Sequence, residues 1–143
     1  MTLVVVDASV AVKWCLPVEQ EELVPEAEEL LDSYQRNETG FVVPDTFWLE
    51  LGNALWKAVR REKISAENAM SALRSVRDLE IPTVPSFDLV PQALSLGIKH
   101  RRTVYDSLYV ALAVQSKNHL ITADERLANA LAAHLPVKWL GAI

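Results

Sequence analysis

The chain has only one cysteine, four glycines and no long apolar run, and each shortage excludes a class of protein. A lone cysteine, Cys15, cannot form an intramolecular disulfide or a CxxC zinc or redox site. With so few glycines there is no glycine-rich phosphate loop and no GxGxxG motif. No stretch approaches the roughly 20 apolar residues of a membrane span, and the N-terminus lacks the basic region of a signal sequence. We therefore expect a soluble protein of the reducing cytoplasm, with no membrane contact.

The charge balance is acidic. The 143 residues include 14 lysines and arginines against 19 aspartates and glutamates, for a formal net charge of −5. This balance does not favour general nucleic-acid binding, so a polyanionic partner would need a local basic patch or a metal ion. The length suits one domain with a core of its own.

Short apolar segments alternate with segments of helical periodicity along the whole chain. Strands are predicted at 3–6, 41–43, 81–84, 119–122 and 137–140. Val4, Val5 and Val6 favour the extended conformation, and the lack of polar alternation predicts a strand buried on both faces. Pro82 suits an edge strand. We therefore predict a three-layer α/β domain over 1–143 with a mostly parallel five-stranded sheet, and a helical hairpin at 45–78 within it.

Acidic residues stand where strands end or helices begin, and the candidates are Asp7, Glu50, Asp106 and Asp124. In parallel sheets the ligand crevice lies beyond the carboxyl ends of the strands, which is where we place Asp7 and Asp124. Each acid also has a structural explanation. Asp7 and Asp106 are suitable helix caps, Asp45 is a natural cap for the helix that follows it, and residues 122–125 match a capping box.

Convergence of the four acids would require a cation. Two carboxylates about 4 Å apart repel by something like 4 kcal/mol at a realistic effective dielectric. Ligands that offer only oxygen favour Mg²⁺ or Mn²⁺ over zinc, and His100, His119 and His134 are too scattered to be ligands. No Ser-His-Asp arrangement is present, so metal-assisted phosphodiester hydrolysis is the chemistry that remains.

Four motifs, in order, resemble those of the PIN-domain ribonucleases, and most closely the VapC-type toxins of prokaryotic toxin–antitoxin pairs. They are Val6-Asp7-Ala8-Ser9, Glu50-Leu51-Gly52-Asn53-Ala54-Leu55, Asp106 running into Ala111-Leu112-Ala113, and Thr122-Ala123-Asp124. The resemblance spans the whole chain. It implies a PIN-like sheet of order 3-2-1-4-5 and an endoribonuclease that depends on Mg²⁺ or Mn²⁺.

The resemblance also implies roles and partners. Asp7, Glu50, Asp106 and Asp124 would be the catalytic, metal-binding quartet, and Ser9, Asn53 and Thr122 would support it. The substrate would be RNA, and the partners would be a second copy of the chain and a small cognate antitoxin.

Beyond the motifs, three features have two explanations each. Lys57 and Arg61 share the Glu50 side of their helix and would guide the RNA backbone, or they form a solvated face. The basic cluster 99–102 is explained at least as well by favourable charge at a helix C-terminus. Trp56 points away from the core and would contact a second copy or the antitoxin, or belong to a satellite core.

Two other classes of function remain as alternatives. One is a non-catalytic RNA- or protein-binding module in which the acids only cap helices. The other is a phosphoacceptor receiver domain, which is weaker because such domains pair two adjacent acids after the first strand, whereas Asp7 is followed by Ala8.

Overall fold

The computed structural model describes residues 1–143 and is built on one five-stranded sheet. All strand pairings are parallel and the order is β3-β2-β1-β4-β5, as predicted. The strands are β1 (Thr2–Val6), β2 (Thr39–Pro44), β3 (Thr83–Val84), β4 (His119–Thr122) and β5 (Val137–Trp139). The fifth strand stops at Trp139, and Leu140, predicted as its last residue, opens a short 3-10 turn.

Strand β1 is the central strand because its side chains are apolar on both faces. Val5 and Val6 are fully buried, Val5 lies beside Val42 of β2, and Val6 lies beside Ile121 of β4. A strand covered on both faces has no reason to alternate polar and apolar residues. This confirms the prediction made from its valine run.

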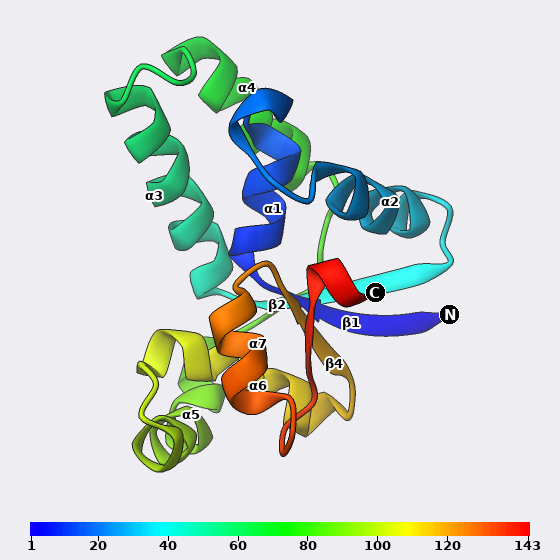
Figure 1. Ribbon diagram of the computed structural model, residues 1–143, viewed down its shortest axis with the longest axis vertical. Helices are drawn as coiled ribbons and strands as arrows, with labels where there is room; N and C mark the ends of the chain where they lie inside the picture. Colours follow the sequence, from blue (N-terminus) through cyan, green and yellow to red (C-terminus); the bar gives the residue numbers. More distant parts are fainter.

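Seven helices cover the two faces of the sheet (Figure 1). On one side lie α1 (Ala8–Cys15), α2 (Val24–Gln35), α3 (Thr46–Arg60) and α4 (Ala66–Arg77), and on the other lie α5 (Ser86–His100), α6 (Val104–Ser116) and α7 (Glu125–Leu131). No helix combines the length and the apolar character needed to span a membrane. The three-layer arrangement matches the prediction.

The direction of the chain reverses between β1 and β4. From β1 the chain proceeds through β2 to β3, then returns to β4 on the other side of β1. The carboxyl ends of β1 and β4 therefore lie side by side, at the position where an open α/β sheet forms its ligand crevice. The side chains that follow β1 and β4 meet there.

Helix α6 is the best buried helix. Residues 107–113 are all buried, because the helix lies between the sheet and α5. This placement agrees with its nearly continuous apolar sequence, and it brings both Asp106 and Tyr109 next to the carboxyl ends of the strands. A helix fixed on several sides is a rigid support for functional groups.

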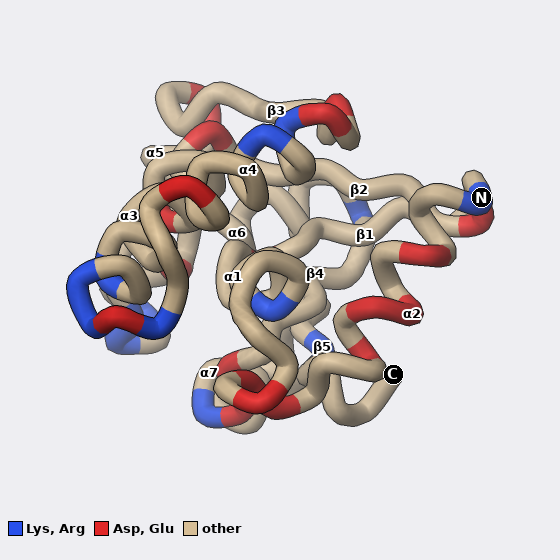
Figure 2. Tube along the Cα trace, turned by 90° about the horizontal axis from the view of Figure 1, so that it is seen from above, with Lys and Arg blue, Asp and Glu red and all other residues tan.

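Helices α3 and α4 are joined by a short turn. Ser65 caps α4 as predicted, and its hydroxyl accepts the Asn68 backbone N–H at 3.0 Å. The apolar side of α3, including Leu51 and Leu55, is buried. Basic residues gather at the turn between the two helices (Figure 2).

Asp45 does not cap its own helix, contrary to the prediction. Its backbone is already helical (φ −61°, ψ −25°), and its side chain makes no capping bond to α3. Instead its Oδ2 accepts the Ser86 backbone N–H at 2.9 Å, at the start of α5. Pairing of β2 with β3 brings these two distant segments together, so Asp45 serves a helix other than its own.

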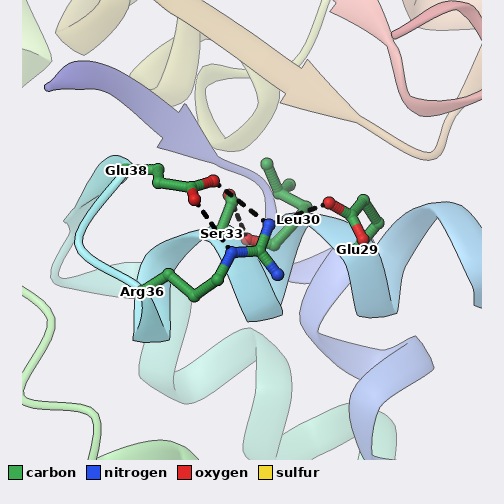
Figure 3. Close-up of polar contacts among 5 residues, drawn as sticks. All are labelled: Glu29, Leu30, Ser33, Arg36 and Glu38. Carbon is green, nitrogen blue, oxygen red and sulfur yellow. Dashed lines mark hydrogen bonds and ion pairs between the residues drawn. The ribbon is translucent and has the colours of Figure 1, made fainter.

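The connection from α2 to β2 is held by an exposed ion-pair cluster (Figure 3). The Arg36 guanidinium donates to both carboxylate oxygens of Glu38 at 3.0 and 3.1 Å and to Glu29 at 3.0 Å. These contacts hold the pKa of Glu38 below its usual value. The cluster lies at the amino end of β2, the opposite edge of the sheet from Asp7, and such exposed pairs contribute little to stability.

Candidate active site

Asp7 directly follows β1 and caps α1, which confirms its structural role. Its Oδ1 accepts the Ser9 backbone N–H at 3.4 Å, and its Oδ2 accepts the Thr122 hydroxyl at 2.7 Å. Burial raises the pKa of Asp7, hydrogen bonds from Thr122 and Ser9 oppose this, and the charge of Asp106 raises it further. A helix cap does not require a buried carboxylate. Burial and the charge of Asp106 therefore destabilise the ionised form of Asp7 at this strand end.

Thr122 and Ser9 connect the ends of β4 and β1. Thr122 is fully buried, and its hydroxyl also accepts the Asp124 backbone N–H at 3.1 Å. Ser9 Oγ accepts the Ala123 backbone N–H at 3.1 Å and lies 3.5 Å from the Thr122 hydroxyl. These hydrogen bonds fix the orientation of Asp7 and the path of the chain into Asp124.

The expected capping box at 122–125 is wrong. Helix α7 begins at Glu125, and its cap is Asp124, whose Oδ1 accepts the Leu127 backbone N–H at 3.1 Å. The Thr122 hydroxyl is already engaged with Asp7, so it is not available to the helix. Asp124 thus combines a capping role with a position beside β4.

Glu50 lies in the second turn of α3 and is half-buried, with its two carboxylate oxygens in different surroundings. Oε2 accepts the Tyr109 hydroxyl at 2.8 Å, whereas Oε1 is buried and has no hydrogen-bond partner. Burial raises the pKa of Glu50 to about 7, Tyr109 opposes this, and the charges of Asp7 and Asp106 add to it. An unpartnered buried carboxylate oxygen requires an explanation.

Tyr109 belongs to the site although its sequence context gave no prediction of it. Its side chain is 2% exposed. Its pKa is raised by burial, then by the charges of Asp7 and Glu50, while a hydrogen bond with the Ala8 backbone opposes this. One available signal was its spacing, because Tyr109 is three residues after Asp106 and therefore on the same side of α6.

Asp106 is the third residue of α6 and is not its cap. Thr103 caps the helix, and its hydroxyl accepts the Asp106 backbone N–H at 3.1 Å. Burial raises the pKa of Asp106, Asp124 raises it further, and Arg102 lowers it. The turn that leads to Asp106 passes close to α5 at Gly97, where a Cβ atom would lie 2.7 Å from the Arg102 carbonyl oxygen.

The four predicted acids act on one another electrostatically. The charge of Asp106 raises the pKa of Asp7 and of Glu50, the charge of Asp7 raises the pKa of Glu50, and the charge of Asp124 raises the pKa of Asp106. The ion pairs of the chain all join other residues, so none of these four acids is in a salt bridge, and Arg102 is the one cation whose charge lowers the pKa of any of them, that of Asp106. Their carboxylates do not close around a single point, because no three acidic, histidine or cysteine side chains stand in a metal-holding group.

Other predicted residues stand apart from this network. Asn53 is exposed one turn beyond Glu50, Lys57 is exposed further along α3, and Arg61 is exposed directly after the last residue of that helix. Trp56 is 54% exposed, and the Arg60 guanidinium lies over its ring, 5.2 Å from the centroid. None of these side chains forms a hydrogen bond or an ion pair with an acid of the site.

Comparison with known proteins agrees with this arrangement. The family model of the PIN domain matches residues 4–131. The fold is thus that of a PIN domain, and the chain belongs to the PIN-domain family. Ribonuclease VapC3 of Pyrobaculum aerophilum is 33% identical over 131 residues, covering 90% of this chain and 95% of the relative. This match lies within the VapC branch and confirms the resemblance drawn from the four motifs.

Solved structures share the fold at low identity. The crystal structure of PAE2754 from Pyrobaculum aerophilum has a TM-score of 0.70 and 20% identity, covering 99% of this chain and 85% of that one. VapBC2 from Rickettsia felis, solved bound to a DNA fragment from their promoter, has a TM-score of 0.64 and 12% identity, covering 96% and 98%. These two matches are evidence for the fold alone.

Proposed function

We propose that this protein is a metal-dependent endoribonuclease that hydrolyses RNA phosphodiester bonds as the toxin of a toxin–antitoxin pair. The observation that carries the proposal is the group of mutually repelling carboxylates at the carboxyl ends of β1 and β4, without an ion pair to any of them. Membership of the PIN family and the ribonuclease relative support it. We propose the cytoplasm as its compartment.

The chemistry of the donor set fits a divalent cation of the Mg²⁺ or Mn²⁺ type, around which the carboxylates would have to close. All four donors, Asp7, Glu50, Asp106 and Asp124, are carboxylates, and Oε1 of Glu50 is buried and unpartnered. Carboxylate oxygens are the ligands such ions prefer. When bound, the ion would polarise the scissile phosphate and lower the pKa of the attacking water.

Groups of the protein itself orient the carboxylate of Asp7. The Thr122 hydroxyl and the Ser9 backbone fix the two oxygens of Asp7. Ser9 supports Thr122 and the Ala123 backbone, so the carboxyl ends of β1 and β4 act as one unit. Asn53, exposed one turn from Glu50, is free to contact a bound RNA.

For RNA binding we propose Lys57 and Arg61. They follow Glu50 by 7 and 11 residues, which at about 100° per residue keeps them on its side of the helix, roughly 10 and 16 Å along the axis. Both are exposed and neither forms an ion pair. Cations so placed would hold the phosphates that flank the cleaved bond.

Two exposed apolar surfaces suit the two protein partners. The first is a stripe at helical spacing on α5, formed by Phe87, Val90, Leu94 and Ile98, which are 41–86% exposed. Stripes of this kind mark interaction sites, and a homodimer would bury it against its own copy. We propose this stripe as the homodimer interface.

The second surface is an apolar groove of about 260 Å³ between α3 and α4. Its lining includes Leu55, Trp56, Val59, Met70 and Leu73. A groove of this shape accepts the apolar side of a partner helix. We propose it as the contact for an antitoxin, the partner that the resemblance to VapC-type toxins implies.

A non-catalytic binding module is the alternative, and one observation favours it: Asp7 and Asp124 both cap helices. An RNA-cleavage assay separates the two. Wild type should cut RNA internally with Mn²⁺ or Mg²⁺ and not with EDTA, and Asp7→Asn should lose at least 100-fold in rate while remaining folded. Intact cleavage by Asp7→Asn would falsify the catalytic assignment.

A further inference from the structure

Tyr109 links two helices of the site. Its hydroxyl donates to Glu50 Oε2 at 2.8 Å, and the nearby charge of Asp7 contributes to the rise of its pKa. The ring lies in the buried part of α6, the helix that also carries Asp106. One side chain therefore connects α3 to α6, close to Asp7.

Glu50 depends on this contact for its orientation. The Tyr109 hydroxyl is the only hydrogen-bond partner of its carboxylate, and it engages Oε2 alone. A glutamate has three rotatable side-chain bonds, and a ligand fixed in advance loses less freedom on binding. The unpartnered oxygen, Oε1, is the one left to a ligand.

We propose that Tyr109 is a positioning residue that holds Glu50 by Oε2 and so presents Oε1 to the divalent cation. This inference rests on the proposed function, because it assigns Glu50 to the same metal site. A tyrosine suits the role because its hydroxyl donates a hydrogen bond without bringing a positive charge. A lysine or arginine in its place would neutralise the carboxylate and compete with the cation.

The competing explanation is structural. A buried tyrosine needs a hydrogen-bond partner, and Glu50 could simply provide one. In that case removal of the hydroxyl would affect stability and leave metal binding unchanged. The two explanations therefore differ in which measurement responds.

The test uses Tyr109→Phe, which keeps the ring and removes only the hydroxyl. We expect its affinity for MnCl₂, measured by isothermal titration calorimetry, to fall by about 10- to 100-fold, the range found for such supporting residues. In RNA cleavage kcat should fall while KM stays within about twofold of wild type. The matched control is Tyr34→Phe, which removes a hydroxyl that donates to the Leu79 carbonyl at 2.8 Å, outside the site. It should bind MnCl₂ as wild type does.

A double-mutant cycle shows whether Tyr109 acts through Glu50. In a Glu50→Gln background, Tyr109→Phe should reduce MnCl₂ affinity by no more than about twofold further. Replacement of Tyr109 by 4-aminophenylalanine, which restores a donor on the same ring, should return the affinity to within about threefold of wild type. This second variant also guards against a Phe variant that fails to fold.

The inference is overturned if Tyr109→Phe binds MnCl₂ as tightly as wild type, if its effect adds fully to that of Glu50→Gln, or if the restored donor does not rescue. A wild-type protein that neither binds MnCl₂ nor cuts RNA would instead remove the proposed function, and the positioning role with it. Cleavage and binding by wild type with an unaffected Tyr109→Phe would remove only the positioning role.

Discussion

Replacing Glu50 by Gln should make the metal-free protein more stable at high pH relative to wild type. The pKa of Glu50 is raised from 4.5 to about 7, chiefly by burial. The folded protein therefore keeps a proton that the unfolded chain releases near pH 4.5, so stability is lost as the pH rises from 4.5 to about 7. Glutamine has no charge to bury and keeps an oxygen that can accept the Tyr109 hydrogen bond.

The size of the effect follows from the same pKa. A rise from 4.5 to about 7 corresponds to at most about 3 kcal/mol against the ionised form. Glu50 is only half-buried, and solvent screening reduces this to roughly 1–2 kcal/mol. The difference in unfolding free energy between Glu50→Gln and wild type should thus grow by about 1–2 kcal/mol between pH 4.5 and pH 8.

Urea unfolding in EDTA at a series of pH values measures this difference. Glu28→Gln, which removes an exposed carboxylate of α2, is the control and should show no such trend. Added MnCl₂ should stabilise wild type more than Glu50→Gln, because binding to the folded state alone raises its stability. The reasoning is refuted if the difference is the same at pH 4.5 and pH 8, or if it changes in the opposite direction.

Three further predictions concern the surfaces. Neutralising Lys57 and Arg61 to Gln should lower the slope of log Kd for RNA against log salt by about 1–2, and an unchanged slope would return these residues to a solvated helix face. Leu94→Glu should convert a dimer to a monomer in analytical ultracentrifugation, whereas a persistent dimer would exclude the α5 stripe as the interface. Trp56→Ala should weaken antitoxin binding at least tenfold in calorimetry and leave the dimer intact; if neither association changes, Trp56 is a satellite core residue.

The sheet could be predicted from the sequence because its signals are local. The valines of β1 and the apolar residues of β2 mark buried strands without reference to any distant residue, and the four motifs supplied the strand order. The family match and the observed order confirm both. The prediction failed by two residues at the start of β3, which begins at Thr83 and not at Ile81, and by one residue where β5 gives way to the turn at Leu140.

The hydrogen-bond partners of the polar side chains could not be predicted, because they are set by strand pairing. Asp45 reaches Ser86 across 41 positions, and Thr122 reaches Asp7 across 115. In both cases a local capping rule named the wrong partner. Asp7 and Ser65 obeyed the rule because no distant group competes for the capping oxygen of either.

Tyr109 shows the same limit at the candidate site. Its contact with Glu50 spans 59 positions and exists only because α3 directly follows β2 while α6 packs against β1 and β2. Its apolar surroundings in the sequence indicate a core residue, which it also is. A residue such as Tyr109, which acts by holding another side chain, therefore could not be predicted from the sequence, because its contact depends on the packing of distant helices.

Anomalous diffraction from a crystal soaked in MnCl₂ tests the metal site most directly. We predict a peak among Asp7, Glu50, Asp106 and Asp124, with Oε1 of Glu50 at about 2.1 Å as a ligand and Oε2 still bonded to Tyr109. The absence of a peak among these acids, in a crystal whose protein cuts RNA when supplied with Mn²⁺, would contradict the assignment. A peak bound by other residues would contradict it equally.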